Sequence, residues 1–205
     1  KKGDAQAQYN VALCYEKGEE IEKDLALAIQ WYTKAAEQGH APAQYNLGVC
    51  YATGQGVKQD YTQAAHWYRK ATEQGLAEAQ YNLGLCYQYG EGVEQDYTQT
   101  VQWYRKAAEQ GYPYAQYELG KRMHDEEGGL LWLHLSAKQG FWLAMKELSD
   151  RLRLSDPKAS ERWLKRYYRN KDKHDAWRWH GKKYMREYMR EQQPEMIDGE
   201  VVILI

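Results

Sequence analysis

One block of sequence recurs every 36 residues and constrains the fold more than any other feature. The block begins Ala-Gln-Tyr at positions 7, 43, 79 and 115, and Asn-Leu-Gly follows Tyr45 and Tyr81. A period of this size is typical of stacked supersecondary units that share one continuous core. The repeat therefore predicts an elongated protein with an extended surface, which favours binding over catalysis.

Residues 42–75 show what one unit is expected to be. Apolar residues recur in it at helical spacing, and Gly48 on the same face permits close approach of a neighbouring helix. Gly54-Gln55-Gly56 supplies the left-handed backbone that ends a first helix, and Asp60 is placed to cap a second one. Each unit is therefore predicted to be a helical hairpin, and the fold class is all-α. The expected inward residues are Ala43, Leu47, Cys50 and Tyr51 in the first helix and Tyr61, Ala64, Tyr68 and Ala71 in the second.

The recurring pattern Ala-x-Ala-x-Tyr-Asn-Leu-Gly, then Gly-x-Gly-Val-x-x-Asp-Tyr and Trp-Tyr-Arg-Lys-Ala, resembles the Sel-one-like repeat family. These repeats are relatives of the tetratricopeptide repeats, and the resemblance is close from Asp4 to Gly120. It implies a right-handed α-solenoid, an α/α superhelix whose first helices line a concave groove. It also implies a non-catalytic adaptor in protein complexes, of a kind that in bacteria is often linked to signalling or host contact.

The repeat becomes irregular after Gly120. Trp132 corresponds to Trp103 but arrives seven residues early, so most of the loop inside the hairpin is replaced by 124–129. A further helix is expected to start at Ser155-Asp156-Pro157, with Ser155 as its cap. We divide the chain into four repeats at 1–140, a degenerate fifth hairpin at 141–170, a basic capping helix at 171–193 and an apolar tail at 194–205.

The three cysteines, Cys14, Cys50 and Cys86, also lie 36 residues apart. Equivalent positions on stacked helices are separated by about 9–10 Å, which exceeds the Cα separation of roughly 7 Å that a disulfide allows. We expect all three to be small buried packing residues.

No sequence motif supports catalysis or a cofactor. Gly54-Gln55-Gly56 lacks the third glycine of a nucleotide loop and follows a helix. Ser155 and Lys158 match Ser-x-x-Lys, but its companion motifs are absent and a helix start explains both residues. The histidines lack metal-site spacing, and 124–127 is better explained as an exposed acidic turn. We therefore predict that the protein is not an enzyme and requires no metal or cofactor.

The candidate binding surface is a second stripe on the first helices. Matching positions contact peptide ligands in tetratricopeptide relatives, and asparagine amides suit an extended backbone because they both donate and accept. An equally weighted alternative is that these side chains bond neighbouring repeats and stiffen the stack. The predicted partner-binding residues on this stripe are Tyr9, Asn10, Tyr45, Asn46, Val49, Tyr81, Asn82, Tyr117 and Glu118.

The net charge of -1 conceals a basic region. Residues 151–191 hold 14 Lys and Arg against 6 Asp and Glu. Four positions of the predicted capping helix that would face the groove combine cationic side chains with an aromatic ring. This end is predicted to bind an acidic side chain, a carboxylate or a phosphate; a solvated capping helix is the alternative. A second hypothesis is that 151–191 binds nucleic acid or another anionic ligand, which the acidic remainder disfavours. The four positions are Arg178, Trp179, Lys182 and Arg186.

The tail is a candidate for self-association. Val201–Ile205 is a run of five aliphatic residues, which we expect to pack on this chain, on a second copy or on a partner. No apolar run approaches the roughly 20 residues of a membrane span. The compartment stays open, because unpaired cysteines favour a reducing one whereas the family favours the bacterial cell envelope or secretion.

Overall fold

The structure is a computed structural model that describes residues 3–18, 21–123, 126–171, 196–197 and 200–201. Within these residues, helices that follow one another in the chain pack into five hairpins. The all-α superhelix predicted from the repeat is confirmed. The hairpins are α1 (Ala5–Lys17) with α2 (Leu25–Glu37), α3 (Ala41–Thr53) with α4 (Tyr61–Thr72), α5 (Ala77–Tyr89) with α6 (Tyr97–Glu109), α7 (Pro113–Arg122) with α8 (Glu126–Lys138), and α9 (Trp142–Leu152) with α10 (Pro157–Lys171).

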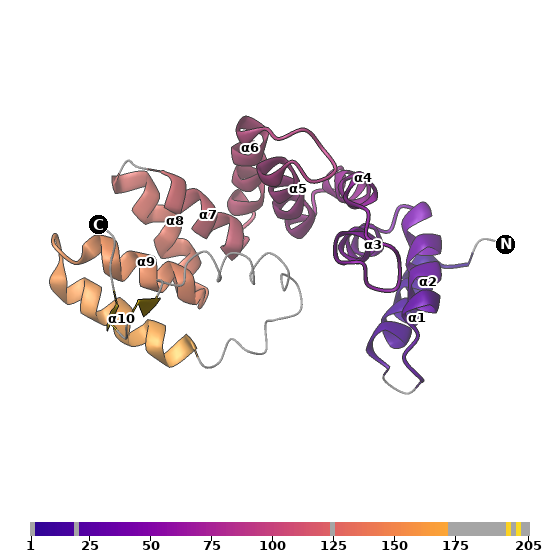
Figure 1. The fold of residues 1–205 in the computed structure, drawn as a ribbon, viewed down its shortest axis with the longest axis horizontal. Helices are drawn as coiled ribbons and strands as arrows, with labels where there is room; N and C mark the ends of the chain where they lie inside the picture. Colours follow the sequence, from indigo (N-terminus) through magenta and orange to yellow (C-terminus); the bar gives the residue numbers. More distant parts are fainter. Residues whose placement is uncertain (1–2, 19–20, 124–125, 172–195, 198–199, 202–205) are drawn as a thin grey trace.

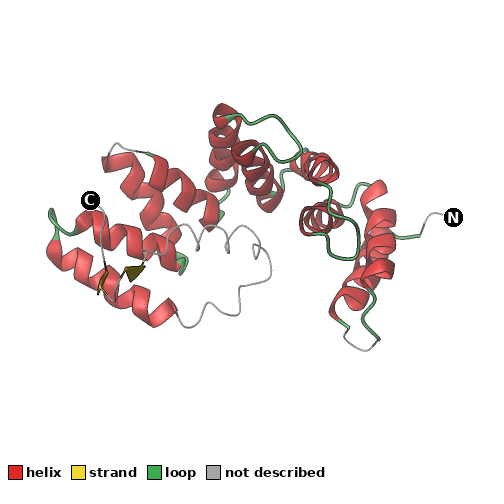
Figure 2. Ribbon diagram, in the orientation of Figure 1, coloured by secondary structure: helices red, strands yellow, loops and turns green. Residues whose placement is uncertain are grey.

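The hairpins follow one another along an arc (Figure 1). The first helices α3, α5 and α7 lie toward the inner side of this arc, and the second helices α4 and α6 lie on its outer side. Near the C-terminus, β1 (Met196–Ile197) pairs with β2 (Glu200–Val201) in an antiparallel arrangement (Figure 2). None of the described helices has both the length and the apolar composition that crossing a bilayer requires.

The predicted helix ends are confirmed in the regular units. The Asp60 carboxylate accepts a hydrogen bond of 3.0 Å from the backbone N–H of Gln63, and Asp24 and Asp96 cap α2 and α6 in the same way. Gly54 ends α3 with a φ of 72°. A side chain with a Cβ is disfavoured at this φ, which explains why glycine stands there.

The two helices of a hairpin meet where a glycine faces a tyrosine ring. A Cβ on Gly48 would lie 2.7 Å from the ring of Tyr68, and a Cβ on Gly84 would lie 2.7 Å from the ring of Tyr104. Both tyrosines are almost completely buried. The missing side chains let the helix axes approach until the rings fill the space between them.

A row of glutamines connects one hairpin to the next. The Gln44 side chain donates to the backbone carbonyl of Ala36 at the end of the preceding hairpin, at 3.0 Å, and accepts from Gln74 at 2.9 Å. Gln116 likewise donates to the carbonyl of Ala108 in the preceding hairpin, at 3.1 Å. The bonds from Gln74, Gln110 and Gln139 to Gln44, Gln80 and Gln116 lie within one hairpin each. These amides are buried and satisfied, so they fix the spacing between consecutive hairpins.

Two expectations about the irregular units are wrong. The segment 124–129 is not all loop, because α8 begins at Glu126. Gly129, near the start of α8, lies close to Gly120 and to the carbonyl of Met123, so the beginning of this helix packs directly on the end of α7. The cap of α10 is Asp156 and not Ser155: its carboxylate accepts from the N–H of Ala159 at 2.9 Å.

Candidate functional site

The predicted ladder of Tyr and Asn side chains forms contacts between consecutive hairpins. Asn46 donates to the Tyr32 hydroxyl at 3.1 Å and lies beside the Tyr9 hydroxyl, so its amide contacts the two phenols of the preceding hairpin. Asn82 lies beside the Tyr45 and Tyr68 hydroxyls at the same register. Each asparagine therefore lies against one phenol from each helix of the hairpin before it.

The paired phenols are packed against each other as well as hydrogen-bonded. The ring centroids of Tyr9 and Tyr32 lie 5.8 Å apart, those of Tyr45 and Tyr68 6.1 Å, and those of Tyr81 and Tyr104 5.3 Å. Burial raises the pKa of the second-helix phenols of these pairs above the usual value for tyrosine. They therefore remain neutral hydrogen-bonding groups throughout the physiological pH range.

The fourth hairpin replaces the asparagine with Glu118 and balances its charge. Arg122 forms an ion pair with Glu118, and its other terminal nitrogen donates to Gln88 at 2.7 Å. The Tyr104 hydroxyl donates to the same Gln88 oxygen at 2.7 Å. Arg122 occupies the register of Cys50 and Cys86, so two positions differ together from the regular repeat.

Burial divides the predicted partner-binding residues into two groups. Tyr45, Asn82, Tyr117 and Glu118 are buried in the stack, as the structural alternative requires. The accessible group consists of Tyr9, Asn10, Asn46, Val49 and Tyr81. Arg178, Trp179, Lys182 and Arg186 lie outside the described residues, as do most of the tail and residues 124–125 of the predicted acidic turn.

A hollow of about 430 Å³ lies among α8, α9 and α10. Arg166 stacks over the Trp163 ring at 4.9 Å, and the His134 ring meets the same indole edge-on at 5.6 Å. Its residues come from three helices of the irregular units, so no local sequence pattern predicts this hollow. It is lined by His134, Leu152, Asp156, Ala159, Arg162, Trp163 and Arg166.

The cysteines differ in exposure, contrary to expectation. Cys50 and Cys86 are buried as predicted, but Cys14 is exposed. The two buried thiols pack against the second helix of the hairpin before them, and no described hairpin precedes α1. All three thiols are free, and no group of three or more potential metal ligands occurs among the described residues.

The thiols should therefore differ in reactivity. Burial raises the pKa of both Cys50 and Cys86 to about 12, so at pH 8 almost no thiolate is present at either. We expect Ellman's reagent to titrate one thiol per chain rapidly in the native protein and three after denaturation. Cys14→Ser should remove the rapid phase, and a rapid phase of more than one thiol in the native protein would contradict the burial of Cys50 and Cys86.

The fold defines an α-solenoid built from helical hairpins, each with a loop between its two helices. The chain belongs to the Sel1 repeat family, whose model matches residues 5–40, 41–76, 77–112 and 113–141. Members of this family are generally non-catalytic scaffolds for protein interactions. No curated protein matches the chain.

Solved structures show the same architecture. A Sel1 repeat protein from Oxalobacter formigenes is 33% identical with a TM-score of 0.75, over 82% of this chain and 72% of that one. A protective antigen of uropathogenic Escherichia coli with an SLR fold is 28% identical with a TM-score of 0.73, over 95% of this chain and 43% of that one. An immunity protein from Pseudomonas aeruginosa is 27% identical with a TM-score of 0.57, over 80% and 64%. This chain thus corresponds to less than half the length of the E. coli antigen.

Proposed function

We propose that the chain is a non-catalytic scaffold that binds a protein or peptide on the inner face of the solenoid, through Tyr9, Asn10, Asn46, Val49 and Tyr81. The observation that carries this proposal is that these side chains belong to first helices, of which α3 and α5 lie toward the inner side of the arc, and remain partly or fully accessible. The buried members of the ladder hold the helices in register, so they support the surface without contacting a partner.

The accessible residues suit an extended peptide. Asn46 directs its amide N–H group at the phenols of the preceding hairpin, and a primary amide also carries an acceptor oxygen. Asn10 is exposed, and its side-chain oxygen accepts from Gln6 at 3.0 Å. Val49 adds an apolar contact beside these amides, a combination that binds backbone groups and small apolar side chains together.

Site-specific photo-crosslinking tests this proposal. A benzoylphenylalanine at Val49 should crosslink to a discrete partner in the native host, whereas the same group at His66, exposed on the outer helix α4, should not. Asn10→Arg should reduce the Val49 crosslink because it places a long cation on the same face. Equal crosslinking from both positions would contradict binding on the inner face. Absence of any crosslink from Val49 would contradict binding of a partner at this site.

The test uses two controls for folding. Asn10 and His66 are exposed, so neither substitution removes a core contact, and circular dichroism melting curves should coincide with that of the unmodified protein. Asn46 is unsuitable as the primary variant because its amide also binds the stack. Its truncation would confuse partner binding with stability.

A further inference from the structure

The loop inside each regular hairpin covers the start of the preceding second helix. A Cβ on Gly56, in the loop between α3 and α4, would lie 2.7 Å from the carbonyl oxygen of Leu25 at the start of α2. A Cβ on Gly92, in the loop between α5 and α6, would lie 2.0 Å from the carbonyl oxygen of Tyr61 at the start of α4. The two loops thus make the same backbone-to-backbone contact, which requires glycine.

Among the glycines whose contacts the structure describes, none lies against the start of α6 as Gly56 and Gly92 lie against α2 and α4. Only residues 123–125 join α7 to α8, whereas 54–60 and 90–96 join the preceding pairs. Tyr97 at the start of α6 is consequently 65% exposed, although Tyr61 at the same register is partly buried.

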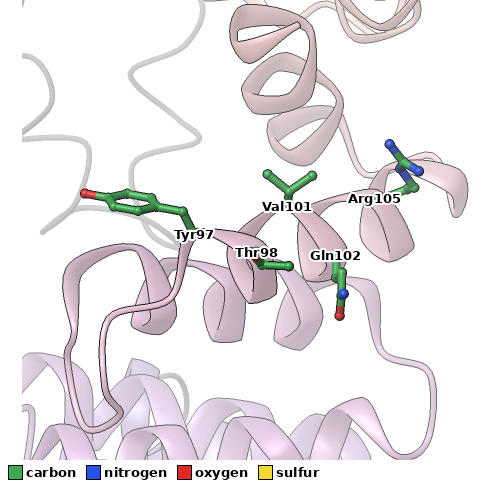
Figure 3. A pocket seen from close by; sticks show the side chains of 5 residues that line it. All are labelled: Tyr97, Thr98, Val101, Gln102 and Arg105. Carbon is green, nitrogen blue, oxygen red and sulfur yellow. The ribbon is translucent and has the colours of Figure 1, made fainter.

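A hollow of about 420 Å³ follows α6 from Tyr97 to Arg105 (Figure 3). Its wall combines an aromatic ring, a threonine and a valine with a cation at the far end. The Tyr97 hydroxyl accepts a hydrogen bond of 3.0 Å from the Gln95 amide, which in turn donates to the backbone carbonyl of Gln88 at 2.7 Å. The exposed ring is therefore held in place before anything binds. The lining residues are Tyr97, Thr98, Val101, Gln102 and Arg105.

The covered equivalent on α4 indicates the charge that the hollow would accept. Arg69 occupies there the register of Arg105, and the loop above α4 carries Glu91. Glu91 precedes Gly92, the residue that lies against the start of α4, and its backbone N–H donates to the carbonyl of Cys86 at 3.0 Å. Arg105 forms no ion pair with any residue that the structure describes.

We propose that the hollow on α6 is a docking site for a turn of a partner protein with the chemistry Gly-acidic-Gly-aliphatic. The second glycine would lie against the backbone of Tyr97, and the acidic side chain would pair with Arg105. Two of the corresponding loops of this chain already lie on α2 and α4, and the third, 18–24, carries Glu20 at the register of the second glycine. A different protein therefore supplies the turn. This site is separate from the proposed inner face.

Binding of a designed peptide to the full chain tests the proposal. The probe is a cyclised, fluorescein-labelled peptide with the sequence of residues 90–96, Gly-Glu-Gly-Val-Glu-Gln-Asp. The matched control has alanine in place of its second glycine, because a Cβ at that position clashes with the helix start. Anisotropy should show the alanine peptide binding about tenfold more weakly, and NMR shift changes should map to α6.

Two protein variants locate the site. Arg105→Gln changes an exposed side chain and should weaken the acidic peptide by roughly threefold at low salt, with little effect on a peptide that has Gln for its first Glu. Val101→Glu should abolish binding, and unchanged circular dichroism verifies its fold. Equal affinity for the glycine and alanine peptides, or binding insensitive to both variants, would overturn the proposal. So would a dimer of the free protein that Val101→Glu dissociates, since a second copy would then be the occupant.

Discussion

Replacing Gly84 with alanine should lower the free energy of unfolding by about 2 kcal/mol, although alanine is normally the better helix former by about 1 kcal/mol. The added Cβ would lie 2.7 Å from two ring carbons of Tyr104 and 3.4 Å from the Cβ of Trp103. Urea denaturation followed by far-ultraviolet circular dichroism measures the change.

The ring of Tyr104 has little freedom to move away. It is fully buried, its hydroxyl donates to Gln88, and its face contacts both Tyr81 and the Arg122 guanidinium. Relief of the clash must therefore separate α5 from α6, which loosens the packing along that hairpin. Gly84→Val should cost more than the alanine variant because its branched side chain fills more of the same space.

A control variant distinguishes this clash from a general effect on the helices. Thr53→Ala changes an exposed position in the last turn of α3, and we expect the free energy of unfolding to change by at most about 0.5 kcal/mol. If Gly84→Ala proved neutral or stabilising, the close approach of α5 and α6 would not constrain the sequence, and the glycine would need another explanation.

Replacing Arg122 with cysteine should destabilise the protein by about 2 kcal/mol, and a second substitution, Glu118→Asn, should restore most of the loss. The single variant leaves the Glu118 carboxylate buried without its cation and removes the donor to Gln88. The double variant recreates the Asn and Cys pair that the second and third hairpins carry at Asn46, Cys50, Asn82 and Cys86.

The expected loss of stability lies between the losses typical of exposed and of fully buried ion pairs. The Arg122 side chain is 28% exposed and that of Glu118 11%, so solvent screens the pair only in part. A double-mutant cycle over the two single variants and the double variant isolates the coupling free energy between Glu118 and Arg122. The stability of each variant is measured by thermal unfolding under reducing conditions. Additive effects within about 0.5 kcal/mol would show that the two positions do not form a unit.

The elements that repeat were predictable because their causes are local. Asp24, Asp60 and Asp96 cap their helices through bonds that span three residues. Gly54 ends α3 through its own backbone conformation. These interactions depend on neighbours a few positions away, so the order of residues along the chain is sufficient to predict them.

The candidate site was predictable only in part, because the same residue type serves different purposes in different surroundings. For Asn46 and Asn82 the sequence leaves partner binding and bonding between repeats equally open, and the structure places both beside the paired phenols of the hairpin before, with Asn46 also partly accessible. Cys14 was expected to be buried like Cys50, and it is exposed. A single unit of the sequence does not show which of its faces a neighbouring unit covers.

The sequence alone determined the hairpin, its caps, the 36-residue period and the membership of a helical repeat family. The tertiary structure decided which of the repeated side chains remain accessible, how Glu118 and Arg122 replace an asparagine and a cysteine, and that a shortened connection uncovers α6. The reason is the range of the interactions. Helix formation and capping depend on residues three or four positions apart, whereas burial and accessibility depend on contacts between helices and between units, such as that between Gln44 and Gln74, 30 residues apart, and that between Asn46 and Tyr32.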